Sequence, residues 1–249
     1  MISVITVTYN SLPTLKEAYE SLLAQEFHDW EWVLQDGSST DGTIEWLTTL
    51  NDPRIAAQSE KDAGIYDALN KAIARAKGQL IGMLHADDLY PHAQVLTLVA
   101  EEFEKGADGV YGDLNYVREH DIQKVLRHWK SCAFYPALLN KGWMPAHPTL
   151  FLKRDIYDQV GYFNTRYRIA SDYDFILRVF SKPAYTFSYL PSTLMLMRYG
   201  GASSKWKNLI TKSKEDLHIM RSNRMRFPML IVLRKISSKF KQFLSKDKS

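Results

Sequence analysis

The chain has 249 residues, of which 45% are hydrophobic and 24% charged, a composition typical of a soluble globular protein with a full core. A single cysteine, Cys132, excludes an internal disulfide and disfavours a thiolate metal cluster, which agrees with a reducing compartment. No run approaches the ~18 apolar residues of a membrane-spanning helix, and the N-terminal stretch MISVITVTYN lacks the basic residues of a secretory signal.

The net charge of +4 is distributed unevenly along the chain. From residue 205 to the end, thirteen Lys and Arg stand against three Asp and Glu, so this segment carries +10 and residues 1–204 carry −6. An acidic body with a basic tail predicts two roles for the chain. We therefore expect a folded domain over residues 1–204 and a basic helical extension over 205–249.

Short strands alternate with helices in the first half of the sequence. Hydrophobic periodicity predicts strands over residues 2–8, 30–35, 54–59 and 79–85, and helices over residues 14–25, 41–50, 65–76 and 92–105. The β-branched first strand is apolar throughout, which is typical of a strand buried on both faces. Gly78 is the expected C-terminal cap of the third helix. This alternation predicts an α/β fold with a mainly parallel sheet flanked by helices.

After residue 108 the pattern changes. Residues 109–117 and 124–129 are predicted to be antiparallel strands, followed by an irregular segment over 131–147. A strand and a short helix follow within 148–161, then a helix over 171–181 and two late strands over 185–190 and 192–199, with helix from 205 onward. The whole pattern indicates one α/β domain with a C-terminal helical extension.

Polar side chains stand at the ends of the predicted parallel strands, where ligands collect in open sheets of this kind. These residues are Thr8, Tyr9 and Asn10 after the first strand, Asp36 after the second, and Asp87 and Asp88 after the fourth. The sequence contains neither GxGxxG after its first strand nor GxxxxGK[ST], which argues against a dinucleotide-binding fold and a P-loop.

The adjacent carboxylates of Asp87 and Asp88 predict a bound cation, because two neighbouring negative charges repel each other. Mg²⁺ and Mn²⁺ are the expected ions, since Mg²⁺ is usually held by one or two carboxylates together with substrate phosphates. The alternative is that Asp88 merely serves as the N-cap of the following helix.

Five segments occur in the order and spacing of a known family. They are ITVTYN at 5–10, QDGSSTDGT at 35–43, DAGIYDALNKAI at 62–73, GMLHADDLYP at 82–91 and SDYDFILR at 171–178. Together they resemble the family 2 glycosyltransferases of GT-A fold over residues 1–204. The resemblance implies inverting transfer of a sugar from a nucleoside diphosphate sugar, such as a UDP- or GDP-sugar, to an acceptor hydroxyl.

The resemblance also implies roles for individual residues. It assigns the nucleoside to Thr8, Tyr9, Asn10 and Asp36, the metal to Asp87 and Asp88, with Asp87 also near the nucleotide, and the catalytic base to Asp172. Asp67 and Asn70, on one face of the third predicted helix, are further candidates for contact with the donor.

The sequence departs from the family pattern at two of these motifs. His85 stands where the family often has an acidic or amide residue, so the metal would rest on Asp87 and Asp88 alone. Ser171 precedes Asp172 where the family often has Glu, and we expect Ser171 and Asp174 to form a capping box that leaves Asp172 facing the site. The alternative for Asp172 is a purely structural interaction with the helix dipole.

Other residues are weaker candidates. Arg198, in RYGGASS, could close over the diphosphate as part of a flexible loop, or be a surface charge. His147 could line the acceptor side, or be a structural histidine. Trp129, Trp143 and Tyr135 could stack on a sugar, or belong to a satellite core.

The basic tail predicts a membrane contact. Apolar residues recur at helical spacing over 225–246, with Lys and Arg between them, a pattern typical of helices that lie on anionic membranes. We expect attachment to the cytoplasmic face of an inner membrane and a glycan or lipid-linked glycan acceptor in surface polysaccharide synthesis. Alternatively, the apolar stripe packs on the domain or against another subunit of a homo-oligomer.

Two other functions remain open from the sequence. A nucleotidyltransferase that makes a nucleotide sugar also uses a metal and carboxylates, although the expected Gly-rich basic loop is missing after the first strand. A non-catalytic sugar-nucleotide-binding protein is the second alternative. Nucleic-acid binding is disfavoured, because the body is acidic and no nucleic-acid motif is present.

Overall fold

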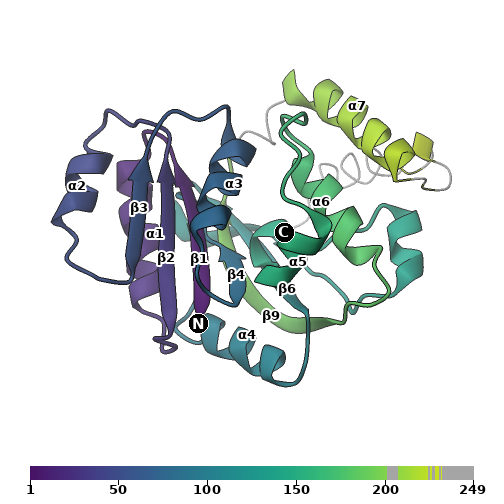
Figure 1. The fold of residues 1–249 in the computed structure, drawn as a ribbon, viewed down its shortest axis with the longest axis horizontal. Helices are drawn as coiled ribbons and strands as arrows, with labels where there is room; N and C mark the ends of the chain where they lie inside the picture. Colours follow the sequence, from purple (N-terminus) through teal and green to yellow (C-terminus); the bar gives the residue numbers. More distant parts are fainter. Residues whose placement is uncertain (201–206, 224, 226–227, 230, 232–249) are drawn as a thin grey trace.

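The computed structural model describes residues 1–200, 207–223, 225, 228–229 and 231. Within this part of the chain the strands form one nine-stranded sheet in the order β3-β2-β1-β4-β8-β6-β9-β5, with β7 paired to β6. Helices cover both faces of the sheet, which confirms the predicted α/β class (Figure 1).

The first four strands are parallel and follow the predicted βαβ pattern. They are β1 Ile2–Thr8, β2 Trp30–Asp36, β3 Ile55–Ser59 and β4 Leu80–Met83, connected by α1 Leu12–Leu23, α2 Thr43–Thr49 and α3 Ile65–Arg75. Figure 1 shows β3, β2, β1 and β4 in this order from left to right. Thr8 pairs with Asp36, and Asp36 with Ser59, so three polar strand ends share one edge of the sheet.

Gly78 lies beyond the end of α3 and is not its cap. The helix ends at Arg75, and Ala76 is its C-cap. A Cβ atom at Gly78 would come within 2.6 Å of Ser3 Oγ and 2.7 Å of the Ser3 nitrogen. The glycine is therefore needed for close approach to β1 rather than to end the helix.

The second half of the sheet is mostly antiparallel, so the sheet as a whole is less parallel than expected. Its elements are β5 Asp88–Leu89, α4 Val95–Glu104, β6 Gly109–Arg118, β7 Asp121–Trp129, β8 Phe151–Lys153, α5 Arg154–Val160, α6 Ser171–Phe180 and β9 Phe187–Arg198. A short 3₁₀ helix, η1 Pro136–Lys141, lies in the predicted irregular segment, and a second, η2 His147–Thr149, begins at the last residue of that segment. β6 and β7 pair antiparallel as predicted, while β6 and β9 run parallel.

Two strand predictions need correction. The strand expected over 79–85 stops at Met83, and Asp88 belongs to a separate strand, β5, that pairs with β9. The N-cap of α4 is Gln94, so Asp88 does not cap that helix. The two late strands form the single strand β9, with a register shift against β6 near Asp113.

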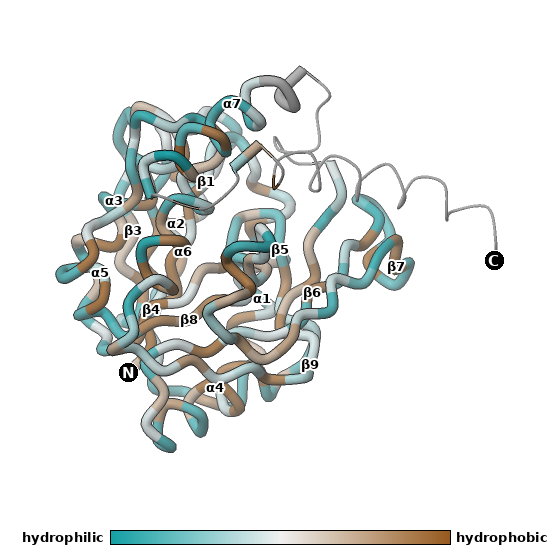
Figure 2. The backbone as a smooth tube through the Cα atoms, turned by 90° about the vertical axis from the view of Figure 1, so that its right-hand side faces the viewer, coloured by the Kyte–Doolittle hydropathy of each residue, from teal (hydrophilic) through white to brown (hydrophobic). Residues whose placement is uncertain are grey.

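Apolar residues of β1 alternate between two cores. Ile2 and Val4 face a cluster with side chains of α1 and α4, whereas Ile5 and Val7 face a cluster with side chains of α3, α5 and α6. Burial on both faces explains why the strand sequence is apolar throughout. In Figure 2 the hydrophobic segments of β4 and β8 lie in the middle of the molecule, between more hydrophilic turns.

The C-terminal part of the described chain packs against α6. Helix α7, Lys207–Ser222, lies beside α6 (Figure 1). Ile219, Met220 and Ile231 are buried in a third cluster with Tyr167 and Tyr173. The described helices include none that is long and apolar enough to cross a membrane. Most of the predicted membrane-binding stretch, 225–246, lies outside the described residues.

Candidate active site

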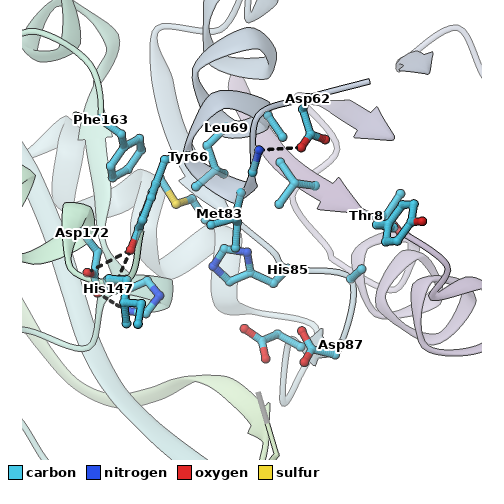
Figure 3. A pocket seen from close by; sticks show the side chains of 18 of the residues that line it. Thr8, Asp62, Tyr66, Leu69, Met83, His85, Asp87, His147, Phe163 and Asp172 are labelled. Carbon is cyan, nitrogen blue, oxygen red and sulfur yellow. Dashed lines mark hydrogen bonds and ion pairs between the residues drawn. The ribbon is translucent and has the colours of Figure 1, made fainter. Parts of the chain in front are cut away.

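A cavity of about 850 Å³ opens at the carboxyl ends of the parallel strands. It is lined by seven of the residues predicted from the sequence, namely Thr8, Tyr9, Asp87, Asp88, Trp129, His147 and Asp172. Figure 3 shows Thr8 and Asp62 on one side of the cavity, Asp172 and His147 on the other, and His85 between them. Residues of β1, β5, η2 and α6, among other elements and loops, therefore meet in one site.

Asp36 and Asn10 do not line this cavity. Asp36 is fully buried, and its carboxylate accepts hydrogen bonds from the Ser39 amide at 2.9 Å, the Ser59 hydroxyl at 2.6 Å and the Ser39 hydroxyl. Asn10 accepts a hydrogen bond from the Thr40 amide at 2.8 Å. Both side chains fasten the loops that form this end of the site, and their predicted contact with a nucleoside stays a prediction.

Asp62 also lines the cavity, on the side of Thr8 and Tyr9, although the sequence analysis did not predict it. One of its oxygens accepts a hydrogen bond from the Gly64 amide at 2.8 Å. Its position shortly after the third strand could have identified it. Asp67, predicted instead, lies outside the cavity, where it accepts the Ala63 amide at 3.0 Å and pairs with Lys71.

Asn70 has a structural role in the described fold. Its amide nitrogen donates to the Phe163 carbonyl at 2.9 Å, and its oxygen accepts the Phe163 amide at 3.0 Å. Among the aromatic candidates, Trp129 lines the cavity, whereas Trp143 packs against Tyr111, Phe134 and Phe180.

Asp88 is a buried carboxylate without a partner in the described part of the chain. Its exposed fraction is 0%, and neither carboxylate oxygen has a hydrogen bond. Burial raises the pKa of this carboxyl well above its ordinary value, the charge of Asp87 raises it further, and the Arg198 guanidinium lowers it. An unpaired buried charge is costly, so this environment favours a bound cation.

Arg198 supports the carboxylate pair from behind rather than lining the cavity. It is 5% exposed, donates to the Asp87 carbonyl at 2.9 Å and to the Glu119 carbonyl at 3.1 Å, and forms an ion pair with Glu17. Its predicted action over a diphosphate stays a prediction. The structure shows instead that it anchors the turn that carries Asp87.

The residues at this turn fit a divalent metal that takes its other ligands from a substrate. The described residues contain no group of three or more His, Cys, Asp and Glu that could enclose an ion. Two adjacent carboxylates, one with both oxygens unpaired, match the way Mg²⁺ is held by one or two protein carboxylates together with phosphate oxygens.

Asp172 lies in the first turn of α6 and faces the cavity. Its side chain is 13% exposed; one oxygen is 3.3 Å from the Tyr66 hydroxyl and the other 3.3 Å from His147 Nδ1 (Figure 3). Burial lowers the pKa of His147 to about 4, although the charge of Asp172 raises it. The imidazole is therefore neutral near pH 7.

The predicted capping box at the start of α6 is wrong. The N-cap is Ala170, the buried Ser171 hydroxyl has no hydrogen-bond partner among the described residues, and Asp174 pairs with Arg178 at 2.9 Å. Four further residues of the site were not proposed from the sequence. They are Tyr66, which contacts Asp172, and Lys61, Arg168 and Lys212, which line the cavity.

Comparisons with known proteins identify the family of the chain. The family model for glycosyl transferase family 2 matches residues 3–175. A PGL/p-HBAD biosynthesis glycosyltransferase of Mycobacterium tuberculosis is 30% identical over 240 residues, which cover 94% of this chain and 89% of that relative.

Two solved structures share the fold. TarS from S. aureus, in complex with UDP-GlcNAc, matches with a TM-score of 0.72 at 19% identity, over 88% of this chain and 65% of that chain. The mannosyltransferase PcManGT from Pyrobaculum calidifontis, in complex with GDP-Man and Mn²⁺, matches with a TM-score of 0.65 at 20% identity, over 94% of this chain and 68% of that chain. The chain thus spans less than two thirds of the TarS fragment. It belongs to glycosyl transferase family 2 and is a glycosyltransferase of GT-A fold.

Proposed function

We propose that this glycosyltransferase moves a sugar from a nucleoside diphosphate sugar to an acceptor hydroxyl with inversion at the anomeric carbon. The observation that carries the proposal is the shared cavity. It holds two adjacent carboxylates at a strand end, of which Asp88 has no hydrogen-bond partner among the described residues, and, on another wall, a carboxylate contacted by Tyr66 and His147. The first group suits a charged diphosphate with its metal, and the second suits proton removal.

The donor would bind at the edge formed by β1, β2 and β3. Thr8, Tyr9 and Asp62 line this side, and the Thr8 hydroxyl is buried without a partner in the described residues. Asp87 and Asp88 would hold Mn²⁺ or Mg²⁺, which supplies charge neutralisation to the departing diphosphate. The complexes of the two structural neighbours, with UDP-GlcNAc and with GDP-Man and Mn²⁺, support a nucleotide-sugar donor.

Asp172 would act as the general base. One Asp172 oxygen would accept the proton of the acceptor hydroxyl while the acceptor oxygen attacks the anomeric carbon from the face opposite the diphosphate. The bond between this carbon and the diphosphate breaks, the nucleoside diphosphate leaves, and the anomeric centre is inverted. The contact with neutral His147 would help to hold the carboxylate in place without adding a positive charge beside it. No covalent intermediate is required.

The proposed acceptor is a glycan or a lipid-linked glycan, presented at the cytoplasmic face of a membrane. The basic, apolar stretch 225–246 supports this location, because such sequences favour anionic membrane surfaces. Membership of a glycosyltransferase family argues against the two alternative functions, a nucleotidyltransferase and a non-catalytic binding protein.

A donor panel tests the proposed function. The protein is incubated with UDP- and GDP-sugars in the presence of Mn²⁺, Mg²⁺ or chelator, and released nucleoside diphosphate is measured. We expect release from one donor class with either metal and little in chelator. Equal release in chelator would contradict the metal role, and the absence of release from every donor, with and without candidate acceptors, would contradict the proposed donor chemistry.

A further inference from the structure

Helix α7 forms part of the wall of the active-site cavity. It packs on the segment that leads into α6, because Ile219 and Met220 are fully buried against Tyr167, Ala170 and Tyr173. One turn of α7 also reaches the cavity itself, where Lys212 is a lining residue. The helix that the charge pattern assigned to a separate extension is thus in contact with the candidate active site.

Glu215, on the same helix, binds three consecutive backbone amides. Its Oε1 accepts a hydrogen bond from the Arg168 amide at 2.9 Å. Its Oε2 accepts hydrogen bonds from the Ile169 amide at 3.0 Å and the Ala170 amide at 2.9 Å. These residues directly precede α6, whose N-cap, Ala170, has no side-chain hydrogen-bonding group. A carboxylate from another helix therefore organises the entry to α6.

The same peptide segment is connected to Asp172 from its other side. The Tyr66 hydroxyl donates to the Ile169 carbonyl at 2.8 Å and lies 3.3 Å from Asp172 Oδ1. A tyrosine hydroxyl has one proton, and the shorter contact assigns it to the Ile169 carbonyl. Ile169 is thus held at its amide by Glu215 and at its carbonyl by Tyr66, three residues before Asp172.

We propose that Glu215 is a positioning residue for glycosyl transfer, which fixes residues 168–170 and through them the Asp172 carboxylate. This inference rests on the proposed function, in which Asp172 is the base. Base and acceptor must meet in a narrow geometry, and a displacement of about 1 Å can lower a rate by about 10²-fold. Charge-assisted hydrogen bonds to three successive amides restrict such displacement more than one neutral bond does.

Four variants of the full chain test this role. Glu215→Ala removes all three acceptor contacts, and Glu215→Gln keeps one carbonyl oxygen that can accept two of the amides. Lys214→Ala changes the exposed neighbour on α7. Ile219→Ala loosens the packing of α7 without removing the carboxylate. The readouts are kcat with the active donor, affinity for UDP and GDP with Mn²⁺, melting temperature, and hydrogen exchange of the amides of residues 168–170.

We expect Glu215→Ala to lower kcat by about 10- to 100-fold, to leave nucleotide affinity within about twofold, and to speed exchange of the three amides. Glu215→Gln should recover most of the activity, and Lys214→Ala should match the wild type. Ile219→Ala should lower the melting temperature with a smaller loss of kcat than Glu215→Ala.

Two results would overturn the inference. One is wild-type kcat and wild-type exchange in a folded Glu215→Ala protein. The other is an Ile219→Ala protein that loses as much kcat as Glu215→Ala at an equal loss of melting temperature, because the effect would then be general loosening. Failure of the proposed function would look different: the wild type would release no nucleotide from any donor, while the exchange measurement still decides whether Glu215 fixes the segment.

Discussion

At the scale of single residues, Asp172 is the side chain on which the proposed chemistry depends. We expect Asp172→Asn to lower transfer by about 10²- to 10⁴-fold, the usual contribution of a general base. Nucleotide affinity should stay unchanged, because the base acts on the acceptor. Steady-state kinetics and nucleotide titration check both, with Asp155→Asn, an exposed carboxylate on α5, as the control. Transfer at the wild-type rate would show that Asp172 is not the base.

Asp88 offers a test of the metal site that does not depend on activity. Its buried, unpaired carboxylate destabilises the metal-free protein, so Asp88→Asn should unfold at the same or a higher temperature than the wild type in chelator. Mn²⁺ with UDP should stabilise the wild type, by about 2.7 kcal/mol at a ligand concentration 100 times Kd, and the variant much less. Thermal unfolding of both proteins measures the two effects. Equal stabilisation of both by Mn²⁺ with UDP would contradict a metal site at Asp88.

His147 predicts a pH dependence of stability. Its pKa is lowered from 6.5 to about 4 in the folded protein, so the unfolded chain binds more protons between these values. Stability contributed by the neutral imidazole is therefore present above about pH 6.5 and is lost as the pH falls toward 4. Urea unfolding at pH 7 and pH 5 should show a smaller decrease for His147→Gln than for the wild type. A decrease of equal size would contradict a neutral His147 with a lowered pKa.

At the scale of elements, the approach of β4 and β8 requires a glycine. A Cβ atom at Gly82 would come within 2.1 Å of Phe151 Cε1, inside a buried and antiparallel strand pair. We expect Gly82→Ala to lower the free energy of unfolding by about 1–3 kcal/mol, as overpacking in a core does. Urea unfolding measures the loss.

A double-mutant cycle is the control for this prediction. Phe151→Leu removes the ring that the new methyl group would meet, so Gly82→Ala should cost less in that background than in the wild type. Equal costs in the two backgrounds would show that the ring is not the cause of the loss. The result matters for the site, because β4 leads directly into the turn that carries Asp87.

At the scale of the whole molecule, the separation of charge predicts binding to anionic membranes. The chain should sediment with phosphatidylglycerol vesicles at low salt and should bind less in high salt. Replacement of Lys235, Lys239 and Lys241 by Gln should weaken binding by roughly 1 kcal/mol per residue. These replacements do not alter Met225 and Ile231, which pack in the cluster around α7.

The matching control replaces three exposed lysines of the body by Gln, namely Lys105, Lys124 and Lys182. These changes should leave binding to the anionic vesicles nearly unaltered. Phosphatidylcholine vesicles in place of anionic ones should lower the binding of every variant alike. If the tail and body variants bind equally, or if the wild type does not bind at low salt, the tail has no anchoring role and its apolar residues serve packing or assembly.

The sequence by itself determined the parallel half of the fold and several of the polar residues that line the cavity. Hydrophobic periodicity is a local property, and it identified β1 to β3 and α1 to α3 within a few residues. Parallel strand ends meet at one edge of a sheet, so Thr8, Tyr9, Asp87 and Asp88 could be assigned to one site before the fold was known.

Only the tertiary structure decided which polar groups face the cavity and which support it. Asp36 and Arg198 satisfy their hydrogen bonds inside the protein, and Asp88 joins β5 because β9 returns beside it. Glu215 reaches the entry of α6 from a helix more than forty residues later in the chain. Such contacts depend on distant segments that pack together, and local periodicity contains no information about them, because it records only which face of an element is buried.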